Sequence, residues 1–273
     1  MSGAVQIDRY VARERRALLA RGRCAPLFAD FLEHSRRWVG DPDGLVAEMM
    51  RQGLAAAALY LTCRPRDEET AWTINLPEPP LNLFFVADAS RGQVVGRYFD
   101  RHVRAQASSR LFVQSVRGFA EPHQSVIEVR GFDVLSMLES YHAQSEQSSA
   151  RFLAYEDDEY LMVMALPGID EAWLRGLSRG EARALLEDAS TTLIEVRPVT
   201  FGCACDERRI MGLATSLFAG QEEELFGDDE RAEILCPRCG HAYEIHRRAF
   251  DAALKASGAG GPATAPPDSA GDS

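Results

Sequence analysis

Four cysteines, arranged as two close pairs after residue 200, constrain this chain more than any other feature of its sequence. Cys203 and Cys205 enclose one residue, Cys236 and Cys239 enclose two, and residues 206–235 separate the pairs. A structural zinc ion is held by four thiolates at the corners of a tetrahedron, each about 2.3 Å from the metal. Two close pairs joined by a folded spacer suit that geometry. We therefore predict a zinc site made of these four cysteines, with one Zn²⁺ per chain.

The residues beside the second pair predict a metal-binding turn on a β-hairpin. Strand-like runs at 232–235 and 242–245 flank this turn, in which Pro237 restricts one backbone angle and Gly240 permits a positive φ. The spacer between the pairs predicts a helix that is capped by Asp206. The apolar residues of that helix recur at helical spacing: Ile210, Leu213, Ala214 and Leu217.

The expected redox environment decides how close cysteine pairs are interpreted. Residues 1–7 lack the basic start and apolar stretch of a secretory signal. The longest apolar run, 54–63, is about half as long as a membrane-spanning helix. We therefore expect a cytoplasmic protein without membrane contact, in which thiols stay reduced. Close pairs then favour metal binding or redox chemistry, with structural disulfides and buried free cysteines as the alternatives.

The charged residues exclude several classes of function. The chain has a net charge of −11, and its 30 basic residues include a single lysine, Lys255. A P-loop needs a Gly-Lys pair and a Schiff-base enzyme needs a lysine in a pocket, so neither is expected. Nucleic-acid binding needs a basic face, which this balance disfavours. No nucleophile elbow or dinucleotide fingerprint is present, and we predict neither an enzyme with catalytic residues nor an organic cofactor.

The remaining cysteines and the histidines offer poorer ligand patterns. Cys24 and Cys63 are interpreted as small hydrophobic residues of the core or its boundary. His241 follows the second cysteine pair and is an alternative ligand, although four cysteines already complete a tetrahedron. We also hypothesise that three nearby arginines lower the pKa of the thiols: Arg208, Arg209 and Arg238.

The predicted elements indicate an α+β protein whose chain is divided into a core domain, a linker, a zinc-binding domain and a tail. Residues 1–167 mix helix and strand signals and predict a core domain. Residues 168–200 predict a helical linker, and residues 201–255 predict the zinc-binding domain. The last segment, 256–273, is rich in Gly, Ala, Pro and Ser and predicts a disordered tail, because such a composition cannot build a core.

Several helix starts and strands can be placed within these parts. Asp41 and Pro42 predict the N-cap and first residue of a largely buried helix that ends before Pro65. Asp133 predicts a second helix start, and Ser178 has capping-box spacing at the start of a linker helix. The predicted strands are 72–76, 81–87, 93–99, 111–117, 125–130, 151–155 and 160–166, the last two forming a hairpin.

These residues resemble the heat-shock protein 33 family, the redox-regulated holdase chaperones of bacteria. The family signature is Cys-x-Cys followed by Cys-x-x-Cys, and residues 201–208 (Phe-Gly-Cys-Ala-Cys-Asp-Glu-Arg) resemble its aromatic-x-Cys-x-Cys-x-x-Arg stretch. In the core domain, residues 138–141 and 145–147 resemble the family's Leu-Glu-x-Tyr and Ser-Glu-Gln motifs, and 81–83 resembles an earlier strand. The resemblance covers about residues 5–255.

The resemblance implies an ATP-independent holdase that binds unfolding client proteins under oxidative stress. It implies that the reduced chain holds zinc, and that oxidation forms the disulfides Cys203–Cys205 and Cys236–Cys239 and releases the metal. Because structural zinc contributes roughly 10–16 kcal/mol to small domains, its loss is expected to unfold residues 203–240. The family also suggests a homodimer in the oxidised state. The linker is expected to expose apolar residues to clients: Trp173, Leu174, Leu177, Leu185 and Leu186.

Two other classes of function stand as alternatives. A zinc-stabilised nucleic-acid-binding or regulatory module without redox switching is disfavoured by the net charge of −11 and by the acidic residues of the spacer. A thiol–disulfide oxidoreductase needs an exposed Cys-x-x-Cys at a helix N-terminus beside a βαβ unit. Here the second pair lies on a predicted hairpin, which argues against that class.

Overall fold

The structure is a computed structural model that divides the chain into two compact units, unit 1 (Met1–Cys203) and unit 2 (Ala204–Ser273). The predicted disordered tail, 256–273, lies outside the described residues except for Ala256, which is the last residue of a helix. The structure describes residues 3–101, 103, 107–145 and 148–256.

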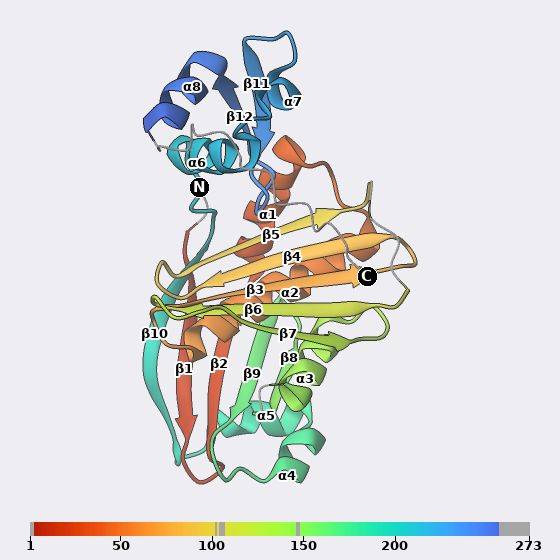
Figure 1. The fold of residues 1–273 in the computed structure, drawn as a ribbon. Coiled ribbons are helices and arrows are strands. Elements are labelled where there is room, and N and C mark those ends of the chain that lie inside the picture. Colours follow the sequence, from red (N-terminus) through yellow and green to blue (C-terminus); the bar gives the residue numbers. More distant parts are fainter. Residues whose placement is uncertain (1–2, 102, 104–106, 146–147, 257–273) are drawn as a thin grey trace, which may run out of the picture. The chain divides into compact units, whose positions relative to one another are not determined.

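Unit 1 combines helices with one large sheet, and the α+β prediction is confirmed (Figure 1). In the sheet the strands follow the order β7-β6-β3-β4-β5-β10-β1-β2-β9-β8. The elements in chain order are β1 (Val5–Ala12), β2 (Ala17–Arg23), α1 (Ala25–Trp38), α2 (Gly44–Cys63), β3 (Glu68–Leu76), β4 (Leu81–Asp88), β5 (Gln93–Phe99), β6 (Arg110–Arg117), β7 (His123–Glu128), α3 (Val134–Gln144), β8 (Ala150–Ala154), β9 (Glu159–Ala165), α4 (Glu171–Gly176), α5 (Arg179–Leu185) and β10 (Thr191–Phe201).

Helix α2 lies at the centre of the core of unit 1. Most of its residues from Val46 to Thr62 are buried, because two adjacent apolar rows make its apolar face wide. Gly53 lets the helix approach β4 closely, since a Cβ atom at this position would lie 2.2 Å from the ring of Phe85. The prediction of a largely buried helix that ends before Pro65 is therefore confirmed.

The prediction of Asp41 as the N-cap of this helix is wrong. The cap is Asp43, whose carboxylate accepts a hydrogen bond from the backbone N–H of Val46 at 2.8 Å. An N-cap side chain reaches the N–H groups two and three residues further on, and Asp41 lies too early for that. Asp41 instead pairs with Arg36 at 2.7 Å.

The strand predictions in unit 1 are confirmed to within a few residues, and β8 and β9 form the predicted antiparallel hairpin. Asp133 caps α3 by accepting hydrogen bonds from the N–H groups of Leu135 and Ser136. The sequence analysis predicted no strand or helix in the segments that form β1, β2 and α1. Their buried residues include Ile7, Leu19 and Phe31.

The predicted helical linker, 168–200, is helical only in part. Helices α4 and α5 occupy its first half, and Ser178 forms the predicted capping box with Glu181 at the start of α5. From Thr191 onward the chain forms strand β10, so the helix prediction is wrong there. Branched Thr, Ile and Val residues favour extended backbone, and Pro198 lacks the N–H that a helix interior requires.

Strand β10 connects the two antiparallel parts of the sheet. It runs antiparallel to β1 along that strand's length and parallel to β5 at Thr200 and Phe201. The ring of Phe201 makes edge contacts with Phe31 and His34 on α1, at centroid distances of 6.1 and 5.7 Å. The chain therefore leaves unit 1 from an anchored position two residues before its first paired cysteine.

Unit 2 contains α6 (Glu207–Phe218), α7 (Glu222–Phe226), β11 (Arg231–Leu235), β12 (Ala242–His246) and α8 (Arg247–Ala256). Asp206 caps α6 through the N–H of Arg209, and β11 pairs with β12 as the predicted antiparallel hairpin. Leu217 was expected on the apolar face of α6 but is 60% exposed. Among the described residues of the whole chain, no helix has both the length and the apolarity needed to cross a membrane.

Candidate metal centre

Two short segments, one before α6 and one in a hairpin turn, carry the four predicted cysteines. Cys203 and Cys205 lie in the extended stretch between β10 and the N-cap of α6, whereas Cys236 and Cys239 lie in the turn between β11 and β12. The turn is closed by the N–H of Cys236, which donates to the carbonyl of His241 at 2.8 Å. The N–H of Gly240 donates back to the carbonyl of Cys236 at 2.9 Å. Gly240 adopts a φ of 80°, which the sequence analysis expected of this position.

The four sulfur atoms lie close enough to share one metal ion. All four Sγ atoms lie within 4.8 Å of one another, and the Sγ atoms of Cys205 and Cys239 are 3.6 Å apart. A tetrahedral ion with ligands at about 2.3 Å separates its sulfur atoms by about 3.8 Å. A disulfide bond would instead hold two sulfur atoms at about 2.05 Å. The structure thus brings together the four residues predicted as ligands, in an arrangement that suits thiolates around a metal.

Burial differs between the two cysteine pairs. Cys236 and Cys239 are buried, with exposed fractions of 2% and 1%, whereas Cys203 and Cys205 are half-buried. The hairpin turn therefore shields its two sulfur atoms more than the extended segment shields its own. A dissolved oxidant meets the first pair more readily than the second.

A tyrosine that sequence analysis missed contacts the cluster. The hydroxyl of Tyr243 on β12 donates a hydrogen bond to Sγ of Cys205 at 3.2 Å. Burial and the neighbouring Cys205 raise the pKa of Tyr243, so its hydroxyl keeps its proton at neutral pH. The available signal was its place on the predicted strand that follows the second pair. His241, the alternative ligand, lies outside the group of four and stacks on the ring of Tyr243 at 4.5 Å.

Arg209, one of the three nearby arginines, contacts the segment that carries the first cysteine pair. Arg209 donates from Nη1 to the carbonyl of Ala204 at 2.9 Å, which fixes the residue between Cys203 and Cys205. Arg208 is exposed and Arg238 is half-buried. The effect of these arginines on the thiol pKa values stays a hypothesis.

The other two cysteines, Cys24 and Cys63, lie outside the group of four. Cys24 is the residue before α1 and is 3% exposed, and Cys63 is the last residue of α2. Burial raises the pKa of each thiol to about 12, so both stay protonated at neutral pH. Protonated buried thiols are poor nucleophiles and poor metal ligands.

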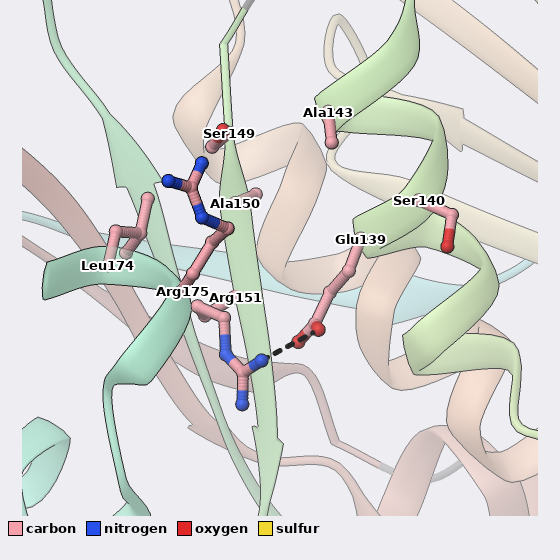
Figure 2. Close-up of a pocket in the computed structure, with 8 residues that line it drawn as sticks. All are labelled: Glu139, Ser140, Ala143, Ser149, Ala150, Arg151, Leu174 and Arg175. Carbon is pink, nitrogen blue, oxygen red and sulfur yellow. Dashed lines mark hydrogen bonds and ion pairs between the residues drawn. The ribbon is translucent and has the colours of Figure 1, made fainter. Parts of the chain in front are cut away.

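A pocket of unit 1 lies between α3, β8 and α4 (Figure 2). Its main polar group is Glu139, which accepts hydrogen bonds from the N–H of Phe152 at 2.7 Å and from Nη1 of Arg151 at 3.1 Å. Burial raises the pKa of Glu139, while these two donors oppose the shift. Both carboxylate oxygens are thus used to attach α3 to β8, which indicates a structural role for this carboxylate.

The family comparison agrees with the fold and with the cysteine cluster. A model of the family described as "Hsp33 protein" matches residues 41–246. The 33 kDa chaperonin of Azotobacter vinelandii is 25% identical over 255 residues, which cover 80% of this chain and 85% of that protein. The 33 kDa chaperonin of Lactobacillus acidophilus is 24% identical over 125 residues, 46% of this chain. This match spans 38% of the Lactobacillus protein's length.

A solved structure supports the same fold. The crystal structure of the 33 kDa chaperonin of Thermotoga maritima, a heat shock protein 33 homologue, aligns with a TM-score of 0.69. The alignment covers 93% of this chain and 99% of that one, at 13% sequence identity. At this identity the likeness establishes a shared fold, and the family assignment rests on the sequence match.

Proposed function

Because this chain belongs to the Hsp33 family, whose model matches residues 41–246, we propose that it is a redox-regulated, ATP-independent holdase chaperone. Its partners are then unfolding proteins, and its setting is the cytoplasm under oxidative stress. The observation that carries this proposal is the group of four cysteine sulfur atoms within 4.8 Å of one another. Such a group can hold a metal while reduced and can form disulfides when oxidised.

The cysteine cluster fits zinc better than a hard metal ion. The donor set is four sulfur atoms, and soft thiolate ligands select zinc over magnesium or calcium. Bound there, Zn²⁺ would act structurally, by holding the hairpin turn against the segment that begins α6. We propose Cys203, Cys205, Cys236 and Cys239 as its four ligands, with one ion per reduced chain.

Oxidation would remove the ligands in two-electron steps. A thiolate attacks the peroxide oxygen, which gives a sulfenic acid and a hydroxide that becomes water on protonation. A neighbouring thiolate then attacks the sulfenic sulfur, forms the S–S bond and releases a second water after protonation. We propose that Cys203 pairs with Cys205 and Cys236 with Cys239. A disulfide sulfur no longer carries the negative charge that held the metal.

The proposed disulfides would not replace the metal as a structural support. Each would join cysteines that are two or three residues apart, so it would constrain a very short loop and restrict the unfolded chain little. Neither would connect the hairpin turn with the segment before α6. Oxidation is therefore expected to leave unit 2 without its main cross-link.

Loss of order at the oxidised cysteines would affect unit 1 through strand β10, which precedes them in the chain. Leu174, Leu177 and Leu185, which the sequence analysis expected to bind clients, are buried in one cluster with residues of β2 and β9. They become available only if α4, α5 and the strand that follows them loosen. Strand β10 ends two residues before Cys203, so loss of order at the cysteines would remove the folded segment that follows this strand. We further propose that the oxidised protein is a homodimer.

The proposal is tested by following metal release and chaperone activity in the same sample. Reduced, zinc-loaded protein is treated with hypochlorite, or with hydrogen peroxide at raised temperature. A chromogenic chelator reports zinc, and light scattering reports the aggregation of a thermally unfolding client. We expect zinc release to accompany suppression of client aggregation, and both to reverse with dithiothreitol and added zinc.

Two outcomes would contradict the proposal. If zinc leaves while client aggregation continues unchanged, the site is structural and the alternative of a zinc-stabilised regulatory module without redox switching is favoured. If the reduced protein already suppresses aggregation fully, the chaperone is not redox-regulated. The variant Cys24→Ala serves as a matched control, because it removes a thiol that lies outside the group of four.

A further inference from the structure

The hydrogen bond between Tyr243 and Cys205 has a chemical consequence for the cluster. The hydroxyl lies 3.2 Å from Sγ of Cys205, which is one of the two half-buried cysteines. Sγ of Cys205 also lies 3.6 Å from Sγ of the buried Cys239. Cys205 thus combines access for a dissolved oxidant with a close approach to the shielded pair.

Neighbouring groups of unit 2 fix the position of this hydroxyl. Tyr243 lies on β12 opposite Ile234 on β11, so the hairpin ladder sets its backbone. His241, two residues earlier on the same face of the hairpin, stacks on its ring with an interplanar angle of 22°. The strand pairing restricts the backbone of this half-buried tyrosine, and the stacked imidazole restricts its ring. Its side chain therefore loses little further conformational freedom when it donates to sulfur.

A donor on a thiolate changes how that thiolate reacts. The hydrogen bond draws electron density from the sulfur lone pair that would attack an oxidant, and bonds to ionised acceptors are the strong ones. Sulfur nucleophilicity falls as the thiolate is stabilised, with a Brønsted coefficient of about 0.4–0.5. Groups beyond the direct ligands commonly tune a metal site in this way.

We propose that Tyr243 slows the oxidation of Cys205 by donating a hydrogen bond to its sulfur. The proposal rests on the proposed function, in which these four cysteines are the oxidised groups. In the step concerned, the Cys205 thiolate gives an electron pair to a peroxide oxygen and forms an S–O bond as the O–O bond breaks, which yields a sulfenic acid and a hydroxide that takes a proton from the buffer acid. The tyrosine proton stays on its oxygen throughout and weakens the attacking sulfur.

The test compares Tyr243→Phe with the unchanged protein, because this substitution removes the hydroxyl and keeps the ring. Both are loaded with zinc and treated with excess hydrogen peroxide. Zinc release is followed with a chromogenic chelator, and alkylation at timed intervals followed by peptide mass spectrometry reports oxidation at Cys205. We expect both rates to rise about three- to tenfold, which corresponds to about half of the free energy of a charge-assisted hydrogen bond.

Two further variants keep the result interpretable. Tyr155→Phe removes a hydroxyl that donates to the carbonyl of Arg179 in unit 1, so it should leave both rates unchanged. Replacing Tyr243 with 3-fluorotyrosine gives a stronger donor of nearly the same size, and should slow both rates. This variant decides the question if Tyr243→Phe binds less than one zinc per chain.

Failure of this inference can be told apart from failure of the proposed function. Equal oxidation rates in Tyr243→Phe and the unchanged protein, with normal activation of the latter as a chaperone, would overturn the role of Tyr243 alone. A faster Tyr243→Phe in a protein that never becomes a chaperone would uphold the role of Tyr243 and remove the proposed function. Faster oxidation of the fluorotyrosine protein would also overturn the role of Tyr243.

Discussion

Unit 1 and unit 2 reach a folded state by different means. Unit 1 holds both large apolar clusters of the described chain, and α2 alone contributes a nearly continuous buried stretch from Leu54 to Thr62. The described part of unit 2 buries few apolar side chains, among them Phe226 and Phe250, whose ring centroids lie 5.5 Å apart. Among the residues of unit 2 that the structure describes, the buried apolar ones other than cysteines are Ile210, Ala214, Phe226, Ala232, Ile245 and Phe250.

The difference indicates where each unit gains its stability. Burial of apolar surface contributes about 25 cal/mol per Å², so a large core can offset the chain entropy that is lost on folding. Below about 70–80 residues a core rarely suffices, and small domains add metals or disulfides. A structural zinc ion adds roughly 10–16 kcal/mol, which exceeds the stability of most small domains. Unit 1 should therefore fold without metal, and unit 2 should depend on it.

Removing one predicted ligand should have the largest effect. Cys236→Ser replaces a buried sulfur with an oxygen that binds zinc poorly, so we expect loss of stoichiometric zinc and of the thermal transition of unit 2. Zinc content by mass spectrometry and calorimetry check this. Cys24→Ala, a control in unit 1, should keep one zinc per chain. A normal zinc content in Cys236→Ser would contradict the assignment of Cys236 as a zinc ligand and the dependence of unit 2 on the metal.

A mutation that creates a cavity in the core of unit 1 should destabilise unit 1 and leave zinc binding unchanged. Phe85→Ala removes a fully buried ring that packs against Gly53, and should lower the free energy of unfolding of unit 1 by about 3–5 kcal/mol. Urea unfolding monitored by tryptophan fluorescence measures this change, because all three tryptophans lie in unit 1. Zinc affinity should stay the same. A large loss of zinc affinity would mean that the two units are not independently stabilised.

Arg197 offers a way to loosen the strand that leads to the cysteines. Its guanidinium is buried and donates to the carbonyls of Leu61, at the end of α2, and Ala89, after β4. Arg197→Leu removes one donor from each carbonyl, at a cost of up to about 1–3 kcal/mol for a buried group left unsatisfied. The carbonyl of Leu61 still accepts from the N–H of Arg64 at 3.4 Å, so the larger cost is expected at Ala89. We expect faster hydrogen exchange in β10 with zinc retained.

The matched control for Arg197 is Arg36→Leu, which alters an exposed pair with Asp41. Exposed ion pairs contribute about 0–1 kcal/mol, so exchange in β10 should not change. Unchanged exchange in Arg197→Leu as well would show that β10 is held by its pairing with β1 and β5 without a contribution from Arg197. Chaperone activity of reduced Arg197→Leu, if present, would connect β10 directly with the proposed activation.

The smallest effect is expected at Cys24 and Cys63. Burial raises both thiol pKa values to about 12, so only about one molecule in ten thousand carries either thiolate at pH 8. Because the pKa is raised, reactivity should appear only as the pH approaches 12. Iodoacetamide labelling at pH 8 should therefore spare both residues in folded protein and modify both in urea. Rapid labelling of folded protein would contradict their assignment as inert core residues.

Sequence patterns predicted the local structure of unit 2 well because its signals are short-range. A cap at Asp206, a hairpin around the turn and a glycine with positive φ each depend on neighbouring residues. The approach of the two cysteine pairs followed from the preference of zinc for four ligands. Tyr243 was missed because its contact with Cys205 arises from folding of the spacer, which no spacing rule describes.

In unit 1 the errors have both long-range and local causes. Strand β10 was predicted as helix, yet its place between β1 and β5 depends on residues far away in the chain. The cap of α2 shifted from Asp41 to Asp43 because two equivalent carboxylates stood two residues apart. Buried Arg197 gave no signal of its two carbonyl partners, since an arginine in a sequence is normally interpreted as a surface residue.

The central claim is that the cysteine cluster holds unit 2 folded while unit 1 folds independently of it. Hydrogen–deuterium exchange on the full chain, before and after oxidation that releases zinc, tests this most directly. We expect amides of α6, β11 and β12 to lose protection, and those of α2, β2 and β9 to keep it. Continued protection of unit 2 after complete zinc release, or equal loss of protection in both units, would contradict the claim.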